Sequence, residues 1–520
     1  MDTKEILRYC IEKGLLLDKG LLSLFSEEGG DIESIKLIIE NIRAYTQKKI
    51  ITKELFYQNK EKVIQGFSTL PKENQRKLEK LKINLGLSIE ISKEFYIGPK
   101  EEIKAQEVLD PVKIMSVNCV LGKKFGVEDF ITHFRGRFNE MKGFLQAHPA
   151  LENLVSIDKI SGVRQGVSII GIVYDKRATK NKNIIFDVED STGITKVLVN
   201  KDKEELYKKA EEVALDSVIG FKCSGNKEIL FANDIIFPEP MLLERKKAPV
   251  EECAAFIGDL HFGSKKFMKE NFLRFIDYLN GKLPGEIEAK KIKYLFIVGD
   301  LITGVGNYPN QEKDLEIVDL EDQFSEIAEV LGTIRKDIKI IISPGNHEGV
   351  RLMEPQPLFD EKYAWALYDL DNVILTENPS NIKIASTKTF PGFNVLLYHG
   401  FSYPYYANNV STLMKIKAMN SPEKIMQYVL KHRHLAPTHG SVQYFPCAKD
   451  VHVIREIPDI FASGHTHKSS IVYFNNILVV SCSTWEEMTP YQEKFGNIPD
   501  HCKVPVINLK TREVKILDFE

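Results

Sequence analysis

The sequence predicts a multidomain α/β protein. Its 520 residues exceed what a single hydrophobic core usually serves, so we expect two to four domains. Helical periodicity dominates the N-terminal region, β-rich runs dominate the middle, and short apolar runs alternate with helical stretches from residue 250 onward. That alternation is typical of an α/β sandwich, in which helices cover stacked sheets.

Composition excludes several classes of protein. The net charge is −3, so any nucleic-acid surface must be a local basic patch rather than a property of the whole chain. The seven cysteines are scattered and never form CxxC, which argues against a zinc ribbon or a secreted disulfide framework and fits a reducing cytoplasm. No apolar run approaches the roughly 18 residues of a membrane span, and the amphipathic start is unlike a signal peptide. We therefore expect a cytoplasmic protein with no membrane partner.

Residues 1–70 are predicted to form a small helical domain. Residues 4–25 and 31–45 place apolar side chains three and four positions apart, and a Gly-Gly-Asp sequence between them indicates a helix stop followed by an N-cap. The following sequence is rich in Lys and Glu, especially over 71–110. We therefore predict a linker over 71–125.

Residues 126–245 are predicted to form a barrel with a leading helix. Helical spacing over 126–146 precedes three strand-like runs, a helix-like run and two further strand-like runs, which is the order of an OB-fold β-barrel. Such barrels often bind single-stranded nucleic acid. The predicted loop 175–182 borders that binding face, so its cations are candidate DNA contacts, although a solvated hairpin tip is an equal alternative. They are Lys176, Arg177, Lys180 and Lys182.

Five apolar runs between 254 and 467 end in polar clusters. The runs read AAFIGDLHFG, YLFIVGDLITG, IKIIISPGNHEG, NVLLYHG and IFASGHTH. Asp-x-His and His-x-His place two donors on one side of an extended segment, because side chains repeat every second residue. One Asp or His after a strand is usually a turn residue, a helix cap or a satisfied polar group. Five such clusters in order instead favour a metal site.

The donor types indicate which metals and how many. Carboxylates, imidazoles and an amide oxygen form a mixed N/O set that suits Mn, Fe, Zn or Ni. Seven donors exceed the needs of one ion but suit two ions that share a carboxylate about 3.5–4 Å from each other. The sequence therefore predicts a two-metal site. No Ser/His/Asp or Cys/His signature and no GxxxxGK[ST] loop is present.

The pattern GDxH…GD…GNHE…H…GHxH resembles that of calcineurin-like metallophosphoesterases. The resemblance implies a β-sandwich flanked by helices over 250–520, and a catalytic His347 over the substrate. It also implies that Asp300 bridges the ions. For the histidine of the fourth motif, His399 is preferred to its rival His439 because His399 ends a clear strand. The first ion would be held by Asp259, His261, Asp300 and His467, and the second by Asp300, Asn346, His399 and His465.

The sequence around these motifs resembles a narrower family. GDLITGVGNYPNQ, IISPGNHEGVRLMEPQPLFD and KIMQYVLKHRHLAPTHGS are similar to the small subunits of archaeal family D DNA polymerases. Thr303 departs from the pattern, since relatives often carry an acidic residue or Asn there. The resemblance implies a heterodimer with a large catalytic subunit, and a 3′→5′ exonuclease, usually Mn²⁺-dependent, that acts on single-stranded DNA and primer 3′ ends.

Several residues keep two interpretations. Arg351 and residues 354–357 would line a DNA cleft or serve loop packing. The KHRH stretch 431–434 would contact phosphates or form a solvated helix end, and Trp485 would stack on a base or, more commonly, pack in the core. A sliding clamp is an open partner, without a clamp-binding motif in the sequence. A catalytically silent scaffold subunit and a free-standing metallophosphatase remain alternative functions.

Overall fold

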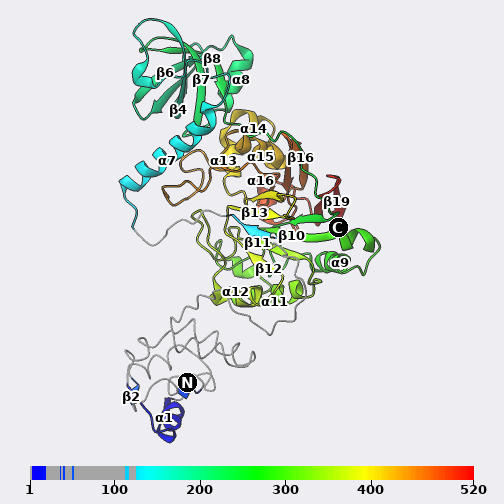
Figure 1. Ribbon diagram of the computed structural model, residues 1–520. Helices are drawn as coiled ribbons and strands as arrows, with labels where there is room; N and C mark the ends of the chain where they lie inside the picture. Colours follow the sequence, from blue (N-terminus) through cyan, green and yellow to red (C-terminus); the bar gives the residue numbers. More distant parts are fainter. Residues whose placement is uncertain (1–2, 19–35, 37–38, 41–49, 52–111, 116–123) are drawn as a thin grey trace. The chain divides into compact units, whose positions relative to one another are not determined.

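The computed structural model describes residues 3–18, 36, 39–40, 50–51, 112–115 and 124–520 (Figure 1). The chain divides into two compact units, Met1–Lys104 and Ala105–Glu520. In the first unit, helix α1 (Thr3–Glu12) buries Ile6 and Cys10, which lie one turn apart, and β1 (Leu16–Leu17) pairs in parallel with β2 (Ile50–Ile51). The rest of the predicted helical domain and most of the predicted linker lie outside the described residues.

The middle of the chain forms a closed five-stranded barrel preceded by helix α7 (Val127–Gln146). The strand order is β4-β5-β6-β8-β7, and helix α8 lies between β6 and β7 in the chain. Alternate side chains of the strands fill the interior, as Phe186, Val188 and Phe221 do. The elements are β4 (Gln165–Ala178), β5 (Ile184–Asp190), β6 (Gly193–Val199), α8 (Glu204–Glu212), β7 (Val218–Gly225) and β8 (Leu230–Ile236), with a 3-10 turn η1 (Ile157–Lys159) before them.

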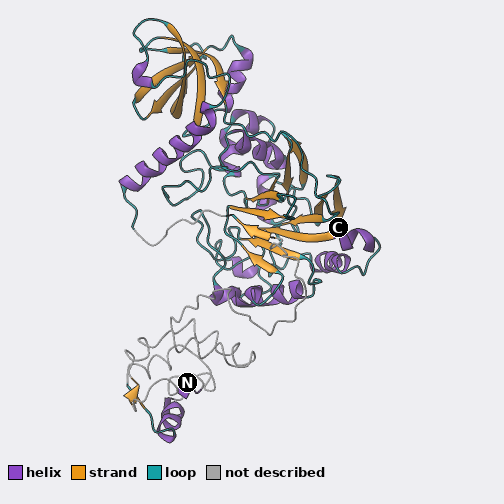
Figure 2. Ribbon diagram, in the orientation of Figure 1, coloured by secondary structure: helices purple, strands orange, loops and turns teal. Residues whose placement is uncertain are grey.

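Two six-stranded sheets form the C-terminal domain, drawn in orange in Figure 2. The first sheet has the order β12 (Val373–Leu375), β11 (Lys339–Ser343), β10 (Ile292–Val298), β9 (Cys253–Ile257), β18 (Lys503–Asn508) and β19 (Val514–Asp518). The second has the order β16 (Ser470–Phe474), β17 (Ile477–Ser481), β15 (Ile460–Ser463), β14 (Phe393–Leu397), β13 (Ser380–Ile384) and β3 (Val112–Ile114). Strand β3 comes from the end of the segment predicted as linker and pairs antiparallel with β13.

The sheets pack face to face and helices cover their outer faces. Along β9, Ala254 and Phe256 face the second sheet, whereas Ala255 and Ile257 face the helices. A strand buried on both faces reads as a continuous apolar run, which is how β9 and β10 appear in the sequence. The first sheet is covered by α9 (Lys269–Leu279), α10 (Glu286–Lys291), α11 (Leu320–Gly332) and α12 (Glu361–Tyr368), and the second by α13 (Tyr403–Asn409), α14 (Ser411–Lys415) and α15 (Pro422–Lys431). The turn η3 (Ala418–Asn420) packs with the helices on the second sheet, and η2 (Gln311–Lys313) and α16 (Pro490–Phe495) lie in the connections between strands.

Strand direction determines where the polar clusters meet. Strands β9, β10 and β11 run parallel to one another in the first sheet, and β14 and β15 run parallel in the second. Their carboxyl ends therefore lie at one edge of each sheet, and each of the five predicted clusters follows one of these ends. The predicted multidomain α/β organisation is confirmed, with mixed sheets in the C-terminal half.

Helix α7 also joins the barrel to the sandwich. Arg137 on α7 donates from Nε to Asp450 Oδ2 at 2.6 Å and from Nη1 to the carbonyl oxygen of Pro437 at 2.7 Å. Phe138 and Met141 pack with Val453 of the sandwich and with barrel residues. The helix therefore contacts both domains through buried groups.

Two expectations from composition can be compared with the described residues. Cys10, Cys223, Cys253, Cys482 and Cys502 are buried free thiols, whereas Cys447 is disulfide-bonded. The expectation of reduced cysteines thus holds for those five but not for Cys447. Within the described ranges, no helix combines the length and the apolar character needed to cross a membrane.

Candidate metal centre

The five strand ends bring eight predicted side chains together. Asp259 and His261 follow β9, Asp300 follows β10, and the remaining residues follow β11, β14 and β15. Asp259, His261, Asp300, His465 and His467 all have positive φ, between 49° and 67°. A positive φ is unfavourable for residues with a Cβ and is concentrated at functional sites. Five such residues in one cluster therefore indicate a functional site.

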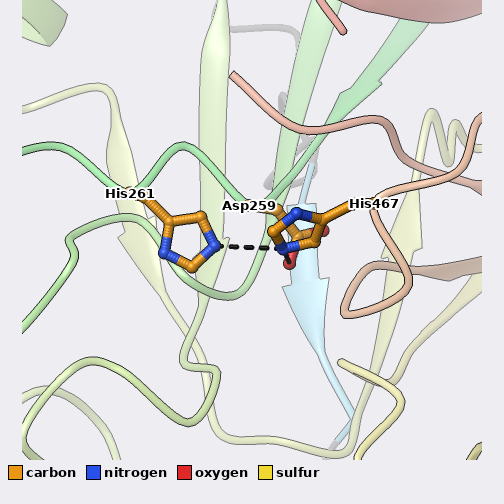
Figure 3. Close-up of side chains that lie close together, drawn as sticks. All are labelled: Asp259, His261 and His467. Atoms are coloured by element: carbon orange, nitrogen blue, oxygen red, sulfur yellow. Dashed lines mark hydrogen bonds and ion pairs between the residues drawn. The ribbon is translucent and has the colours of Figure 1, made fainter. Parts of the chain in front are cut away.

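Three groups of side chains have ligand atoms within 4.8 Å of one another. They are Asp259/His261/His467, His261/Asp300/His347 and Asp300/His399/His465. Figure 3 shows the first group, in which His261 Nε2 and His467 Nε2 lie 3.1 Å apart beside the Asp259 carboxylate. Asp300 belongs to both of the other groups, so it occupies the position of a shared carboxylate.

Asn346 completes the second half of the centre. Its Oδ1 lies 3.1 Å from His399 Nε2 and 3.1 Å from His465 Nδ1, while His399 Nε2 lies 3.3 Å from Asp300 Oδ2. One amide oxygen, one carboxylate oxygen and two imidazole nitrogens therefore converge on one point. This is a suitable donor set for a divalent transition metal.

Glycines allow the loops to approach this closely. At Gly299 a Cβ would lie 2.2 Å from His399 Nδ1, and at Gly345 a Cβ would lie 2.3 Å from Asp300 Oδ1. Neither clash could be relieved without moving a candidate ligand. The glycines of the GD and GNHE motifs are thus required by the space that the neighbouring donors occupy.

Backbone amides orient the carboxylates. The His465 N–H donates to both oxygens of Asp259, at 3.0 and 2.9 Å, and the His347 N–H donates to Asp300 Oδ1 at 3.0 Å. Asp300 Oδ2 is left to face the imidazoles of His261, His347 and His399. Each loop therefore positions the carboxylate of another loop.

Burial keeps most of the imidazoles neutral. It lowers the pKa of His261 and of His465 to about 3, and that of His467 well below its ordinary value. Neutral imidazoles have a free lone pair, which metal binding requires. Burial also raises the pKa of Asp259 well above its ordinary value. The charge of His399 opposes this rise only in part, so the Asp259 carboxylate is incompletely compensated when no cation is bound.

Asp300 and His399 behave differently because they pair with each other. Burial alone would raise the pKa of Asp300, but the charges of His399 and His347 hold it well below its ordinary value. Burial likewise opposes the charged form of His399, yet Asp300 raises the pKa of its imidazole to about 10. His399 Nδ1 lies 3.1 Å from the Val298 carbonyl oxygen, so Nδ1 carries a proton and Nε2 faces the centre.

His347 lies at the open side of the centre. Its side chain is 19% exposed, compared with 1% for His399 and 4% for His261. Nδ1 lies 2.8 Å from the Thr303 carbonyl oxygen, which can only accept, so Nε2 is the nitrogen that faces Asp300 and solvent. Thr303, the departure from the sequence pattern, thus orients His347 through its backbone rather than its side chain.

The rival histidine lies elsewhere. His439 Nδ1 lies 2.8 Å from the Tyr444 hydroxyl, and the His439 N–H donates to Asp216 Oδ2. His399, and not His439, is the residue beside Asp300, in line with the choice made from the end of its strand.

Two of the ambiguous predictions are decided by burial. Trp485 is fully buried and packs against Phe272 and Phe275, so the core-packing interpretation is confirmed. The KHRH stretch does not form a solvated helix end. His434 is buried against Asp450, Lys431 pairs with Glu212, and Arg433 stacks on Phe144. The solvated-helix-end interpretation was wrong, because the barrel and α7 pack over the stretch, whereas phosphate contact by Lys431 or Arg433 stays a prediction.

The predicted DNA contacts on the barrel differ in how available they are. Strand β4 extends to Ala178, so residues 175–178 pair with β5 instead of forming a loop. Lys176 donates from Nζ to the carbonyl oxygens of Glu211 and Val213, and Arg177 pairs with Asp175 and Asp187. Lys180 and Lys182 are exposed at the strand connection.

Arg351 and residues 354–357 serve the loop itself. Arg351 donates from Nη2 to the Pro355 carbonyl oxygen at 2.8 Å and lies over the Phe445 ring. Glu354 is fully buried beside His452, with 2.5 Å between Oε2 and Nε2. These contacts favour the loop-packing alternative over a cleft lining.

Sequence reasoning missed several supporting residues. Glu348 of the GNHE motif accepts from the Gly345 N–H at 2.7 Å and from the Leu301 N–H, and burial raises its pKa to about 7. Gln492 on α16 places its side-chain Nε2 2.7 Å from His467 Nδ1. The position of Glu348 within the motif was a usable signal, whereas nothing in the local sequence singles out Gln492.

Comparison with known proteins agrees with this geometry. The calcineurin-like phosphoesterase family model matches residues 254–469. The DNA polymerase II small subunits of Pyrococcus abyssi, Pyrococcus furiosus and Methanothermobacter thermautotrophicus are 38%, 37% and 33% identical to the chain. The matches cover 76%, 79% and 76% of this chain, and 63%, 67% and 80% of those proteins.

The chain belongs to the family of archaeal DNA polymerase II small subunits. The resemblance to family D small subunits seen in the motifs is thereby confirmed, as is a calcineurin-like phosphoesterase domain in the C-terminal half. Among solved structures, an archaeal phosphodiesterase aligns with 51% of this chain and 98% of its own, at 13% identity and a TM-score of 0.26, which is too low to support any conclusion.

Proposed function

We propose that this chain is the proofreading subunit of a replicative DNA polymerase and acts as a two-metal 3′→5′ exonuclease on single-stranded DNA. The observation that carries the proposal is that Asp300 lies in two convergent sets of ligand atoms, and that His261 joins one of them to Asp259 and His467. Two ions that share a carboxylate suit the hydrolysis of a phosphodiester, because one ion can serve the attacking oxygen and the other the leaving oxygen.

The residues divide between the ions as follows. Asp259, His261, Asp300 and His467 hold the first ion, and Asp300, Asn346, His399 and His465 hold the second. Mn²⁺ is the metal we expect, and Fe, Zn or Ni would suit the same donors. Bound there, two divalent cations supply Lewis-acid activation of water and neutralise charge at the phosphate.

His347 acts on the substrate and not on a metal. Its exposed Nε2 is oriented toward the centre by the contact of Nδ1 with the Thr303 carbonyl. In its imidazolium form, with a proton on Nε2 as well as on Nδ1, it donates a hydrogen bond to the phosphoryl group, or gives the Nε2 proton to the leaving 3′ oxygen of the shortened strand.

The remaining assignments follow from the family. We propose a large catalytic DNA-synthesising subunit as partner, primer 3′ ends as substrates, a sliding clamp as an open partner and the cytoplasm as location. The closed order of the barrel and the place of α8 support its assignment to the OB class. On the barrel, Lys180, Lys182 and the exposed Arg177 remain candidate DNA contacts, whereas the Lys176 ammonium is held by the carbonyl oxygens of Glu211 and Val213.

Single-stranded DNA labelled at its 5′ end, incubated with the protein and Mn²⁺, tests the proposal. We expect ladder-like shortening from the 3′ end that is lost in His465→Ala. His347→Asn lowers the rate about 10²- to 10⁴-fold, the usual contribution of a proton-transfer group, and leaves Mn²⁺ content unchanged. His439→Asn is the matched control and retains full activity.

Two other outcomes would replace the proposal. DNA that stays intact both with the chain alone and with the large subunit indicates a scaffold with a vestigial centre. Rapid hydrolysis of a generic phosphomonoester with DNA untouched indicates a free-standing phosphatase.

A further inference from the structure

Two buried amide side chains join the loops that carry the proposed ligands of the second ion. Gln356 is 3% exposed and Asn378 is not exposed, and neither belongs to any ligand group. Both lie in loops of the phosphoesterase domain, Gln356 after β11 and Asn378 after β12.

The two amides form a continuous hydrogen-bonded series. The His399 N–H donates to Asn378 Oδ1 at 2.9 Å, and Asn378 Nδ2 donates to Gln356 Oε1 at 2.6 Å. Gln356 Nε2 then donates to the Gly345 carbonyl oxygen at 2.7 Å. The backbones of Gln356 and Asn378 also exchange hydrogen bonds, at 2.7 and 3.2 Å, so both side chains rest on one rigid bridge.

The ends of the series determine its direction. His399 offers a backbone donor and Gly345 a backbone acceptor, so only one orientation of each amide satisfies every bond. Turning either amide would place donor against donor or acceptor against acceptor in a buried site, at a cost comparable to a lost hydrogen bond. The series therefore sets a defined separation between the two loops.

That separation sets the geometry of the second ion site. Gly345 immediately precedes Asn346, whose Oδ1 lies 3.1 Å from both His399 Nε2 and His465 Nδ1. The series holds the Gly345 carbonyl on one side and the His399 amide on the other. A change in its length would move Asn346 and His399 relative to each other.

The first ion site has a separate support. His467 Nδ1 lies 2.7 Å from Gln492 Nε2, and Gln492 Oε1 accepts from the Thr489 N–H at 2.9 Å. Thr484 Oγ1 donates to the Asp259 carbonyl oxygen at 2.8 Å. Within the described residues, neither Gln356 nor Asn378 bonds to Asp259, His261 or His467.

We propose that Gln356 and Asn378 are positioning residues that set the affinity of the second ion independently of the first. The inference rests on the two-metal centre proposed above. Outer groups that orient ligands typically contribute 10- to 100-fold to metal affinity. We assign that contribution to the second site alone.

The test measures Mn²⁺ binding to the full chain by calorimetry and metal analysis, in two backgrounds. His261→Ala leaves the second site as the intact one, and His465→Ala leaves the first. Asn378→Asp and Gln356→Glu each replace one donor by an oxygen with almost no change of shape. We expect either variant to weaken Mn²⁺ binding 10- to 100-fold in the His261→Ala background and less than twofold in the His465→Ala background.

Asn372→Asp is the matched control. Asn372 is an equally buried asparagine, 1% exposed, whose Nδ2 donates to the Ile338 carbonyl oxygen away from the centre. It should leave Mn²⁺ affinity unchanged in both backgrounds. Thermal unfolding in chelator establishes that each variant is folded, and Gln356→Glu alone decides the question if Asn378→Asp does not fold.

Failure of the proposed function and failure of the positioning role give different results. If the wild-type chain does not take up two Mn²⁺ ions, the proposed function fails. If the wild type binds two ions and the variants retain both affinities, or lose both equally, then the positioning role is overturned while the metal centre stands.

Discussion

Two buried clusters of histidine and aspartate in this chain differ in how the negative charge of their aspartates is balanced. One is the candidate metal centre, and the other surrounds Asp450 between α7 and the sandwich. In the second cluster, Asp450 Oδ2 accepts from Arg137 Nε at 2.6 Å and lies 2.9 Å from His434 Nε2, while Oδ1 accepts from the His452 N–H. Burial alone would raise the pKa of Asp450, but Arg137 and His434 hold it well below its ordinary value.

The difference is the source of positive charge. The Asp450 cluster contains its own guanidinium, so its carboxylate and its donors are satisfied by one another. In the described part of the chain, no lysine or arginine is hydrogen-bonded or ion-paired to Asp259 or Asp300, and only imidazoles and backbone amides face them. The Asp450 cluster is therefore complete without an added cation, whereas the carboxylates of the candidate metal centre lack a lysine or arginine partner, which a bound cation could replace.

Spacing in the sequence does not separate the two clusters. His432 and His434 repeat the His-x-His spacing of His465 and His467. His432 is the C-cap of α15 and its Nδ1 lies 2.9 Å from the carbonyl oxygen of Tyr428 one turn earlier, whereas His465 follows a buried strand. The element that precedes the motif decides whether both imidazoles reach the same space.

Asp450→Asn should give the largest effect on stability. It removes the charge that compensates Arg137 and leaves a buried guanidinium unpaired, which costs about 3–5 kcal/mol of unfolding free energy. Urea unfolding in chelator measures the loss, and Mn²⁺ content per folded chain should stay at the wild-type value. A loss below about 1 kcal/mol would mean that Asp450 is not an essential partner of Arg137.

Asp259→Asn, the same substitution in the metal centre, should change the stability of the ion-free protein in the opposite direction. The ion-free protein should gain about 0.5–2 kcal/mol, as replacement of an uncompensated functional group commonly does. The single His465 N–H can still be accepted by the amide oxygen. With Mn²⁺ present the order should reverse, because only the wild type gains binding energy. Unfolding curves with chelator and with Mn²⁺ test both signs; a loss of stability in chelator would contradict the assigned charge imbalance.

The pH dependence of stability that His452 of the Asp450 cluster contributes should be a smaller effect than those of the two substitutions above. Burial opposes the charged form of His452, but Asp450 and Glu354 raise its pKa to about 9. Since an unfolded histidine titrates near 6.5, the folded state holds the extra proton between about 6.5 and 9. The stability advantage of wild type over His452→Gln should be full below pH 6.5 and decline as pH rises through 9. An advantage that is flat over this range would show that His452 is neutral in the folded protein.

The α/β organisation was predictable from sequence because its signal is local. The strand-terminal motifs and the preference for His399 over His439 likewise follow from which residues end an apolar run. Prediction failed where a side chain is satisfied by a distant segment. Lys176 looked like an exposed cation of a loop, but α8 supplies its partner, whereas Arg177 is exposed and pairs with Asp187 of strand β5. KHRH looked like a surface stretch, but α7 and the barrel cover it.

By itself the sequence determined which chemical groups this protein presents, because Asp-x-His and His-x-His place their donors through the short-range geometry of the backbone. Only the tertiary structure decided which groups meet. The parallel strands of two different sheets carry Asp300, His399 and His465 to one place, and the amides of Gln356 and Asn378 set the distance between two of the loops. That outcome depends on contacts between residues up to about two hundred positions apart, for which local periodicity holds no information.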